Sequence, residues 1–152
     1  MGKSGENMLS GEYRHNIDLK GRIIIPSRIR EEMGDRIIIT RGLDGCLFGY
    51  NEQTWNSIME KLNKLPFTKR DARNFTRFMT SGAITLEFDK QGRVNIPSYL
   101  NQYASLEKEV VIVGVIDRIE IWSRNNWEEF MNNNVESLSD ISENLFNSNF
   151  DL

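Results

Sequence analysis

Apolar runs and polar turns alternate along this chain in an order that occurs twice. IDLKGRIIIPSRI, residues 17–29, returns as FDKQGRVNIPSYL, residues 88–100, at an offset of 71 residues. The likeness continues weakly downstream, where residues 36–50 resemble residues 109–122 with small shifts in length. Similarity at a fixed period indicates a duplicated structural unit. The pattern therefore predicts two copies of a module of roughly 40 residues, separated by an insertion.

Each copy carries the motif D-x-x-G-R after an apolar strand. The motif residues are Asp18, Gly21 and Arg22 in the first copy and Asp89, Gly92 and Arg93 in the second. Aspartate suits the first position of a type I turn, and glycine at the fourth position can adopt the positive φ of a hairpin bulge. The motif therefore predicts a tight turn in which the aspartates and glycines are structural and the arginine opens the returning strand.

The elements after the turn follow the same order in both copies. A short strand ends at a proline, because proline cannot donate to a ladder. A short helix, a β-branched strand and a final strand come next. In the first copy these are residues 23–25, 27–33, 37–39 and 46–50; in the second the strands are residues 94–96, 110–113 and 119–122. A module this small cannot bury much core, so we expect each copy to pair with the other.

Helical spacing fills the insertion and the C-terminal region. Apolar residues from Trp55 to Leu65 predict one helix, and Thr68 with Asp71 resembles a capping box that starts a second. Trp127 begins the apolar stripe of a third helix, with a break at residues 132–134. A last helix should fray at its end. The expected division is residues 1–10 as a tag or disordered start, 11–54 as module 1, 55–82 as a helical connector, 83–126 as module 2, and 127–152 as C-terminal helices with an acidic tail.

Charge and composition narrow the function. The net charge is −3, but the stretch from Glu128 onward holds six acidic residues and no Lys or Arg, so the rest carries +3. One cysteine, Cys46, and one histidine, His15, allow no internal disulfide and make a metal site improbable. No catalytic motif and no long apolar run occurs. We expect a non-enzymatic protein without cofactor, metal, membrane or small-molecule substrate. Residues 1–7, MGKSGEN, read as a vector scar.

Several segments together carry a family resemblance. GEYRHNIDLKGRIIIPSRIRE, TRGLDGCLFGY, TKRDARNF, SGA and DKQGRVNIP occur in this order between Gly11 and Trp127. They resemble segments of the MraZ family of bacterial transcriptional regulators. The resemblance implies an α+β, β-rich fold: tandem AbrB-like swapped-hairpin (double-split β-barrel) modules with intervening and C-terminal helices. It also implies a ring homo-oligomer, located in the cytoplasm on the nucleoid, that binds direct repeats upstream of the division and cell-wall gene cluster, as a repressor.

The resemblance also assigns candidate DNA-binding residues. These are Arg22 and Arg93, with Lys20 and Lys90 as neighbours. From spacing alone, each arginine could equally form only a surface ion pair with the nearby aspartate. We expect Arg93 to contribute less, because Gln91 stands where the first copy has Lys20. A basic stripe at Arg70, Arg73 and Arg77 is more typical of a solvated face or a subunit contact than of a second DNA surface.

Two other functions stay open at this point. The chain could be a ring-shaped scaffold that binds proteins, or an AbrB-like antitoxin that binds both DNA and a toxin. Antitoxins usually carry a disordered toxin-binding tail. The region after the second module is short, acidic and partly amphipathic, which favours packed helices over such a tail.

Overall fold

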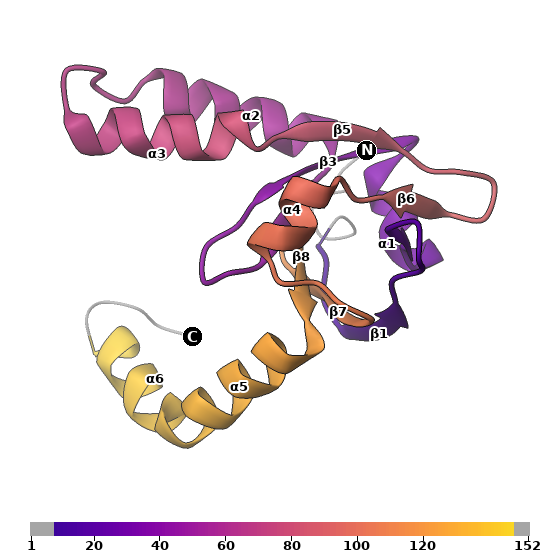
Figure 1. Ribbon diagram of the computed structural model, residues 1–152. Helices are drawn as coiled ribbons and strands as arrows, with labels where there is room; N and C mark the ends of the chain where they lie inside the picture. The colour runs from indigo at the N-terminus through magenta and orange to yellow at the C-terminus, as the bar shows by residue number, and fades with distance from the viewer. Residues whose placement is uncertain (1–7, 148–152) are drawn as a thin grey trace.

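A computed structural model describes residues 8–147 of the chain (Figure 1). The supposed vector scar at residues 1–7 and the last residues of the expected frayed end lie outside these. In chain order the elements are β1 (Glu12–Asn16), β2 (Arg22–Ile24), α1 (Ser27–Met33), β3 (Arg36–Arg41), β4 (Leu47–Tyr50), α2 (Glu52–Asn63), α3 (Arg70–Ser81), β5 (Ile84–Glu87), β6 (Arg93–Asn95), α4 (Ser98–Tyr103), β7 (Glu109–Val115), β8 (Arg118–Ser123), α5 (Arg124–Asn134), the 3-10 turn η1 (Val135–Ser137) and α6 (Leu138–Phe146).

The two repeats are interleaved in one sheet. Its strand order is β1-β7-β8-β4-β3-β5, and all pairs are antiparallel. The first strand of the first repeat, β1, pairs with β7 of the second, while β5 of the second repeat pairs with β3 of the first. A separate two-stranded ladder joins β2 to β6. This exchange of strands confirms the predicted pairing of the copies and the swapped-hairpin fold.

The sheet is buried on both faces, which explains its continuous apolar strands. In β7, Val110 and Ile112 enter a core shared with Ile37 and Ile39 of the first repeat. The intervening Val111 enters a second core with Trp122 and the helices. Successive side chains of a strand point to opposite faces. One face is therefore covered by the β2–β6 ladder with α1 and α4, and the other by the helices that follow each module.

Helix ends differ from the sequence expectations. The Asn51 side chain accepts a hydrogen bond from the backbone N–H of Thr54 at 2.7 Å, so α2 begins at Glu52, before Trp55. The predicted capping box at Thr68 is wrong, because the N-cap of α3 is Lys69 and its side chain makes no capping bond. The predicted break at residues 132–134 is also wrong, since α5 continues to Asn134 and the break is the 3-10 turn that follows.

The α2–α3 hairpin and the C-terminal helices α5 and α6 lie at the end of the molecule away from the D-x-x-G-R loops. In Figure 1 the α2–α3 hairpin projects to the upper left, α5 and α6 lie at the lower left, and the β5–β6 connection points to the right. Leu9 falls in the stretch expected to be a tag or disordered, yet it is 8% exposed and forms a β-bridge to Ile116. Among residues 8–147, no helix is both long and apolar enough to cross a membrane.

Candidate nucleic-acid interface

The β2–β6 ladder brings the two D-x-x-G-R loops together. Equivalent residues Ile23 and Val94 pair directly, with Arg22 opposite Asn95 and Ile24 opposite Arg93. Each glycine also bonds the residue that follows the other copy's strand. The Gly92 carbonyl accepts a hydrogen bond from the backbone N–H of Ile25 at 3.0 Å, and the Gly21 carbonyl accepts one from the backbone N–H of Ile96 at 2.8 Å. The antiparallel pairing of equivalent strands is locally two-fold: the loops lie at the two ends of the three-residue ladder, and Arg22 and Arg93 are diagonal neighbours across it.

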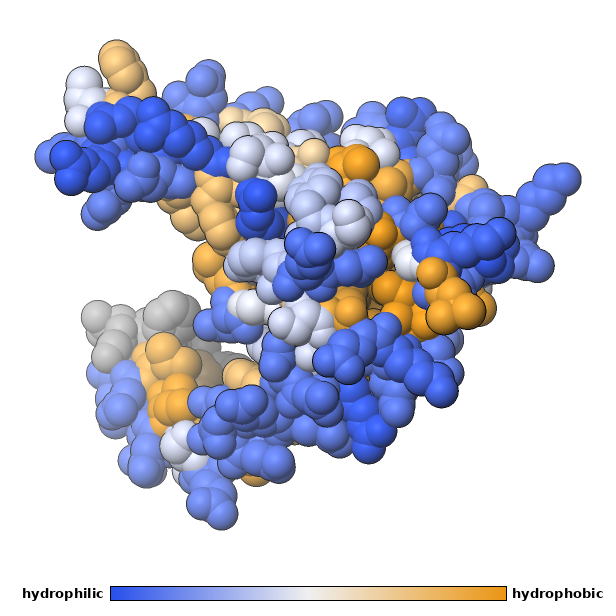
Figure 2. Space-filling model, in the orientation of Figure 1, coloured by the Kyte–Doolittle hydropathy of each residue, from blue (hydrophilic) through white to orange (hydrophobic). Residues whose placement is uncertain are grey.

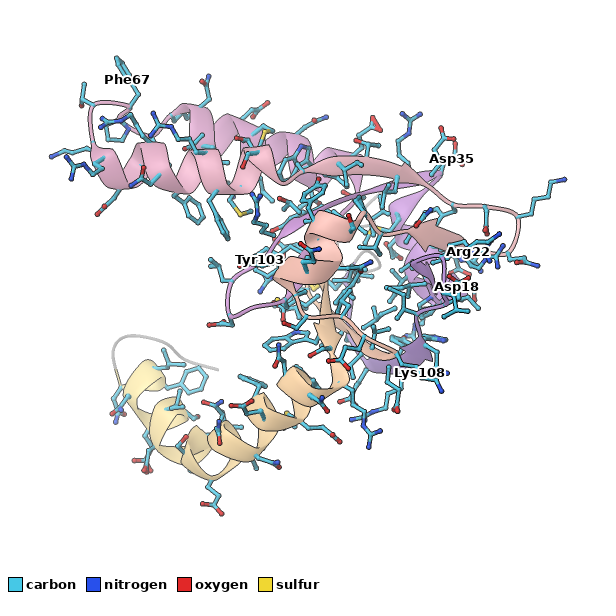
Figure 3. The ribbon with its side chains drawn as sticks, in the orientation of Figure 1. Asp18, Arg22, Asp35, Phe67, Tyr103 and Lys108 are labelled. Carbon is cyan, nitrogen blue, oxygen red and sulfur yellow. The ribbon has the colours of Figure 1, made fainter. Side chains whose placement is uncertain are left out.

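Inside the first loop, one carboxylate holds both the turn and the arginine. Asp18 Oδ1 accepts hydrogen bonds from the backbone N–H groups of Lys20 and Arg22, both at 2.9 Å. Its Oδ2 accepts from Arg22 Nε at 2.7 Å (Figure 3). Gly21 closes the turn with a φ of 80°, and its N–H donates to the Asp18 carbonyl at 3.0 Å. The left-handed conformation explains why this position is glycine.

The second loop reproduces this geometry. Asp89 Oδ1 accepts from the backbone N–H groups of Gln91 and Arg93 at 2.9 Å, and Oδ2 accepts from Arg93 Nε at 2.8 Å. Gly92 has a φ of 79°. The structure thus brings all the motif residues into two equivalent turns.

These bonds orient the arginines without using up their donors. The backbone N–H of Arg22 is the largest influence that lowers the pKa of Asp18, and that of Arg93 does the same for Asp89; in each loop these bonds outweigh desolvation. Each carboxylate therefore stays charged and fixes a guanidinium through Nε. Neither Nη atom of Arg22 or Arg93 donates a hydrogen bond to any residue in the range 8–147. Two arginine forks are held in place with donors to spare.

The two loops carry equal formal charge, and the smaller contribution expected of Arg93 to DNA binding stays a prediction. Lys20 of the first loop does correspond to Gln91, but Leu19 corresponds to Lys90. Each loop thus has one lysine, shifted by one position. All four of these side chains are exposed, and Leu19 is fully so. The loops differ in where the lysine stands and in the apolar tip of the first.

Two residues that the sequence did not single out pack beneath the glycines. Arg30 of α1 donates from Nε to the Ile25 carbonyl at 3.0 Å, and a Cβ on Gly92 would overlap its guanidinium. Asn101 of α4 occupies the equivalent position in the second repeat. Its Nδ2 donates to the Ile96 carbonyl at 3.3 Å and lies 3.5 Å from where a Cβ on Gly21 would stand. In the sequence, only the 71-residue offset of the repeats relates Arg30 to Asn101.

Comparison with known proteins decides the family. A family model described as "MraZ protein, putative antitoxin-like" matches residues 8–78 and again residues 79–149, at the offset that relates the two loops. This chain belongs to the MraZ family. It is 53% identical over 145 residues to a protein of Ligilactobacillus salivarius (strain UCC118) named "Transcriptional regulator MraZ", an alignment that covers 95% of this chain and 100% of that protein. The MraZ family is one of transcriptional regulators, and the chain is not an enzyme.

The basic stripe of this MraZ chain lies away from the loops. Arg70, Arg73 and Arg77 belong to α3, in the hairpin that projects from the opposite end of the molecule (Figure 1). Arg73 donates to the Phe67 carbonyl at 3.0 Å, and Arg77 contacts Asn74 at 3.4 Å. The stripe is therefore a surface separate from the loops.

The single cysteine, the single histidine and the acidic residues of the described region form no further candidate site. Cys46 is fully buried, and burial is the main cause that raises the pKa of its thiol. His15 lies half-buried in β1. Within residues 8–147, no group of three or more His, Cys, Asp or Glu side chains could hold a metal ion.

Proposed function

We propose that this MraZ family chain regulates transcription by binding double-stranded promoter DNA through its two D-x-x-G-R loops. The observation that carries the proposal is the β2–β6 ladder, which makes two oriented arginines diagonal neighbours on two paired strands. The name of the relative from Ligilactobacillus salivarius supports a role in transcription. Arg22 and Arg93 are the proposed main contacts, with Lys20 and Lys90 as neighbours.

Arginine suits this role because of its planar fork. A guanidinium can donate to guanine O6 and N7 together, or to a phosphate with two parallel bonds. Ordering a long side chain normally opposes binding by about 0.5–1.5 kcal/mol. In each loop the aspartate already orders the guanidinium through Nε. The loops are therefore prepared for DNA before contact.

The chain also has two surfaces that suit assembly into a ring. Exposed apolar side chains occur on the α2–α3 hairpin at Leu65, Phe67 and Phe75, and near α6 at Val135, Leu138, Ile141 and Leu145. Figure 2 shows apolar side chains at α6 in the lower left. The hairpin adds Lys64, Lys69, Arg70, Arg73 and Arg77, whereas the C-terminal region adds Glu136, Asp140 and Glu143.

The hairpin surface is basic and the C-terminal surface is acidic, so the two are complementary in charge. They are two different surfaces of the same chain. We infer a head-to-tail contact in which α6 of one copy covers the hairpin of the next. Such contacts close into rings or extend as filaments. A closed ring would present several loop pairs in the same sense. It would therefore favour direct repeats over a palindrome, and several weak contacts would gain about 10²–10⁴-fold from avidity.

The finer biological role follows the family resemblance. We propose repression of the division and cell-wall gene cluster from direct repeats in its promoter, with the protein acting in the cytoplasm on the nucleoid.

A second candidate is an antitoxin-like role, and two observations favour it. The family description includes the term antitoxin-like, and the exposed apolar face of α6 could cover a toxin instead of another copy. The oligomeric state separates the two. Light scattering of the purified chain should give a closed oligomer larger than a dimer. A stable monomer at micromolar concentration would contradict the ring and favour a free docking face.

The experiment for DNA binding compares the chain's own promoter fragment with a scrambled fragment at matched salt. A mobility shift of the promoter fragment alone is the expected result. Equal affinity for both fragments would contradict sequence-specific regulation, because contacts to phosphates alone carry no sequence information.

A further inference from the structure

The two D-x-x-G-R loops are supported by different side chains at equivalent positions. The guanidinium of Arg30 lies against the Gly92 turn, where a Cβ on that glycine would overlap it. A neutral amide, that of Asn101, lies beneath the Gly21 turn. Both donate to the backbone carbonyl of the residue before the proline, Ile25 for Arg30 and Ile96 for Asn101. The backbone thus needs a donor at this position, and asparagine is sufficient to supply it.

Arg30 therefore has a charge that its structural role does not require. Arg22 and Arg93 each form an ion pair with an aspartate at 2.7 and 2.8 Å. Arg30 has no carboxylate within 4.0 Å among residues 8–147. It is half-buried, so part of the residue still reaches solvent beside the loop. An unpaired guanidinium held against a turn is a suitable donor to an anion.

We propose that Arg30 binds a DNA backbone phosphate beside the second loop, a contact that the first loop lacks. This inference rests on the proposed DNA-binding function. Its consequence is that the two loops of one subunit are not interchangeable on DNA. The subunit then meets each box in one preferred direction, although its loops are almost two-fold symmetric.

Two charged residues, Asp35 and Lys108, lie at the bases of the loops, and their backbone carbonyls bond the loops. The Asp35 carbonyl accepts from Phe88 at the base of the second loop, and the Lys108 carbonyl accepts from Ile17 at the base of the first. Figure 3 labels Asp35 and Lys108 on either side of the Asp18–Arg22 turn. Asp35 forms no ion pair with Arg30 within the described chain. Among the described residues, the Arg30 guanidinium therefore stays without a carboxylate partner against the second turn.

The test is Arg30→Asn, which copies the residue of the other repeat and keeps a donor for Ile25. Affinity of the full chain for its promoter fragment is measured over a series of salt concentrations. Each phosphate contact contributes about 0.9 to the slope of log affinity against log salt. We expect Arg30→Asn to reduce the slope by about 0.9 for each subunit on the DNA. Ethylation interference should lose one phosphate per box. Thermal midpoint and oligomeric state should stay unchanged.

Arg28→Asn is the matched control, because Arg28 is exposed on the same helix, two residues away, and forms no hydrogen bond or ion pair with either loop. An equal change in slope for Arg28→Asn would overturn the proposal, since the effect would then be one of general charge. An unchanged slope and footprint for Arg30→Asn, with binding still lost in Arg22→Ala, would overturn this inference alone. A wild-type chain that does not bind the promoter fragment would instead overturn the proposed function.

Discussion

Replacing Ile112 by alanine should destabilise both repeats together. Ile112 is fully buried in β7, between Tyr13 of β1 and Ile121 of β8. Its side chain packs in the core that also holds Ile37 and Ile39 of the first repeat. Truncating a buried isoleucine to alanine typically costs about 2–5 kcal/mol, because the cavity closes only partly. For a chain of this size, that lowers the thermal midpoint by roughly 4–20 °C.

Hydrogen exchange measured by mass spectrometry reports on each repeat separately. Peptides covering β3 (36–41) follow the first repeat, and peptides covering β8 (118–123) follow the second. Because the strands are interleaved, both peptides should lose the same free energy of protection. The control is Ile24→Ala, the same chemical change at a side chain 44% exposed; it should cost less than about 1 kcal/mol. If β3 kept its wild-type protection in Ile112→Ala, the repeats would fold independently and the shared core would be refuted.

Three further predictions concern the loops, a strained turn and the DNA. Gly21→Ala and Gly92→Ala should each lower the thermal midpoint and the promoter affinity, since both positions have positive φ and a Cβ would crowd the Ile96 carbonyl at Gly21 and displace the Arg30 guanidinium at Gly92; wild-type values in either variant would contradict the role of the turns. Ile116→Asn should stabilise the chain by about 1 kcal/mol in thermal unfolding, because Ile116 has a φ of 62° that costs a β-branched side chain roughly 1–2 kcal/mol, whereas its side chain is largely exposed; an unchanged or lower midpoint would show that the turn is not strained. Inserting about 5 base pairs between promoter repeats should weaken binding sharply and a full turn should restore it; a mobility-shift series indifferent to spacer phase would contradict reading by adjacent subunits.

The D-x-x-G-R turns could be predicted because their chemistry is local. Asp18 and Gly21 specify the turn through bonds that span four residues, and the same logic applies to the second copy. The repeat itself predicted that the copies pair. These inferences needed no knowledge of distant contacts.

The pairing of particular strands could not be read in the same way. The apolar run in β7 has side chains buried on both faces, so it gives no alternation from which to infer a face or a neighbour. Helix starts were missed for a related reason. Asn51 directly follows an apolar strand and was not recognised as the N-cap of α2.

Arg30 was missed because its role depends on tertiary structure. In the sequence it is one charged residue of a short helix. Only the exchange of strands places α1 of the first repeat beneath the loop of the second. The unequal support of the loops follows from that exchange.

The central claim is that the oriented loop arginines bind promoter DNA, and Arg22→Ala tests it most directly. Affinity for the promoter fragment is measured by fluorescence anisotropy at fixed salt, with Arg70→Ala on the distant hairpin as the control. Each lost base contact costs about 1–3 kcal/mol, and the loss is multiplied over the subunits of a ring. The account predicts loss of specific binding in Arg22→Ala, with unchanged thermal midpoint and oligomeric state, and near wild-type affinity in Arg70→Ala. Wild-type affinity in a well-folded Arg22→Ala protein would contradict it.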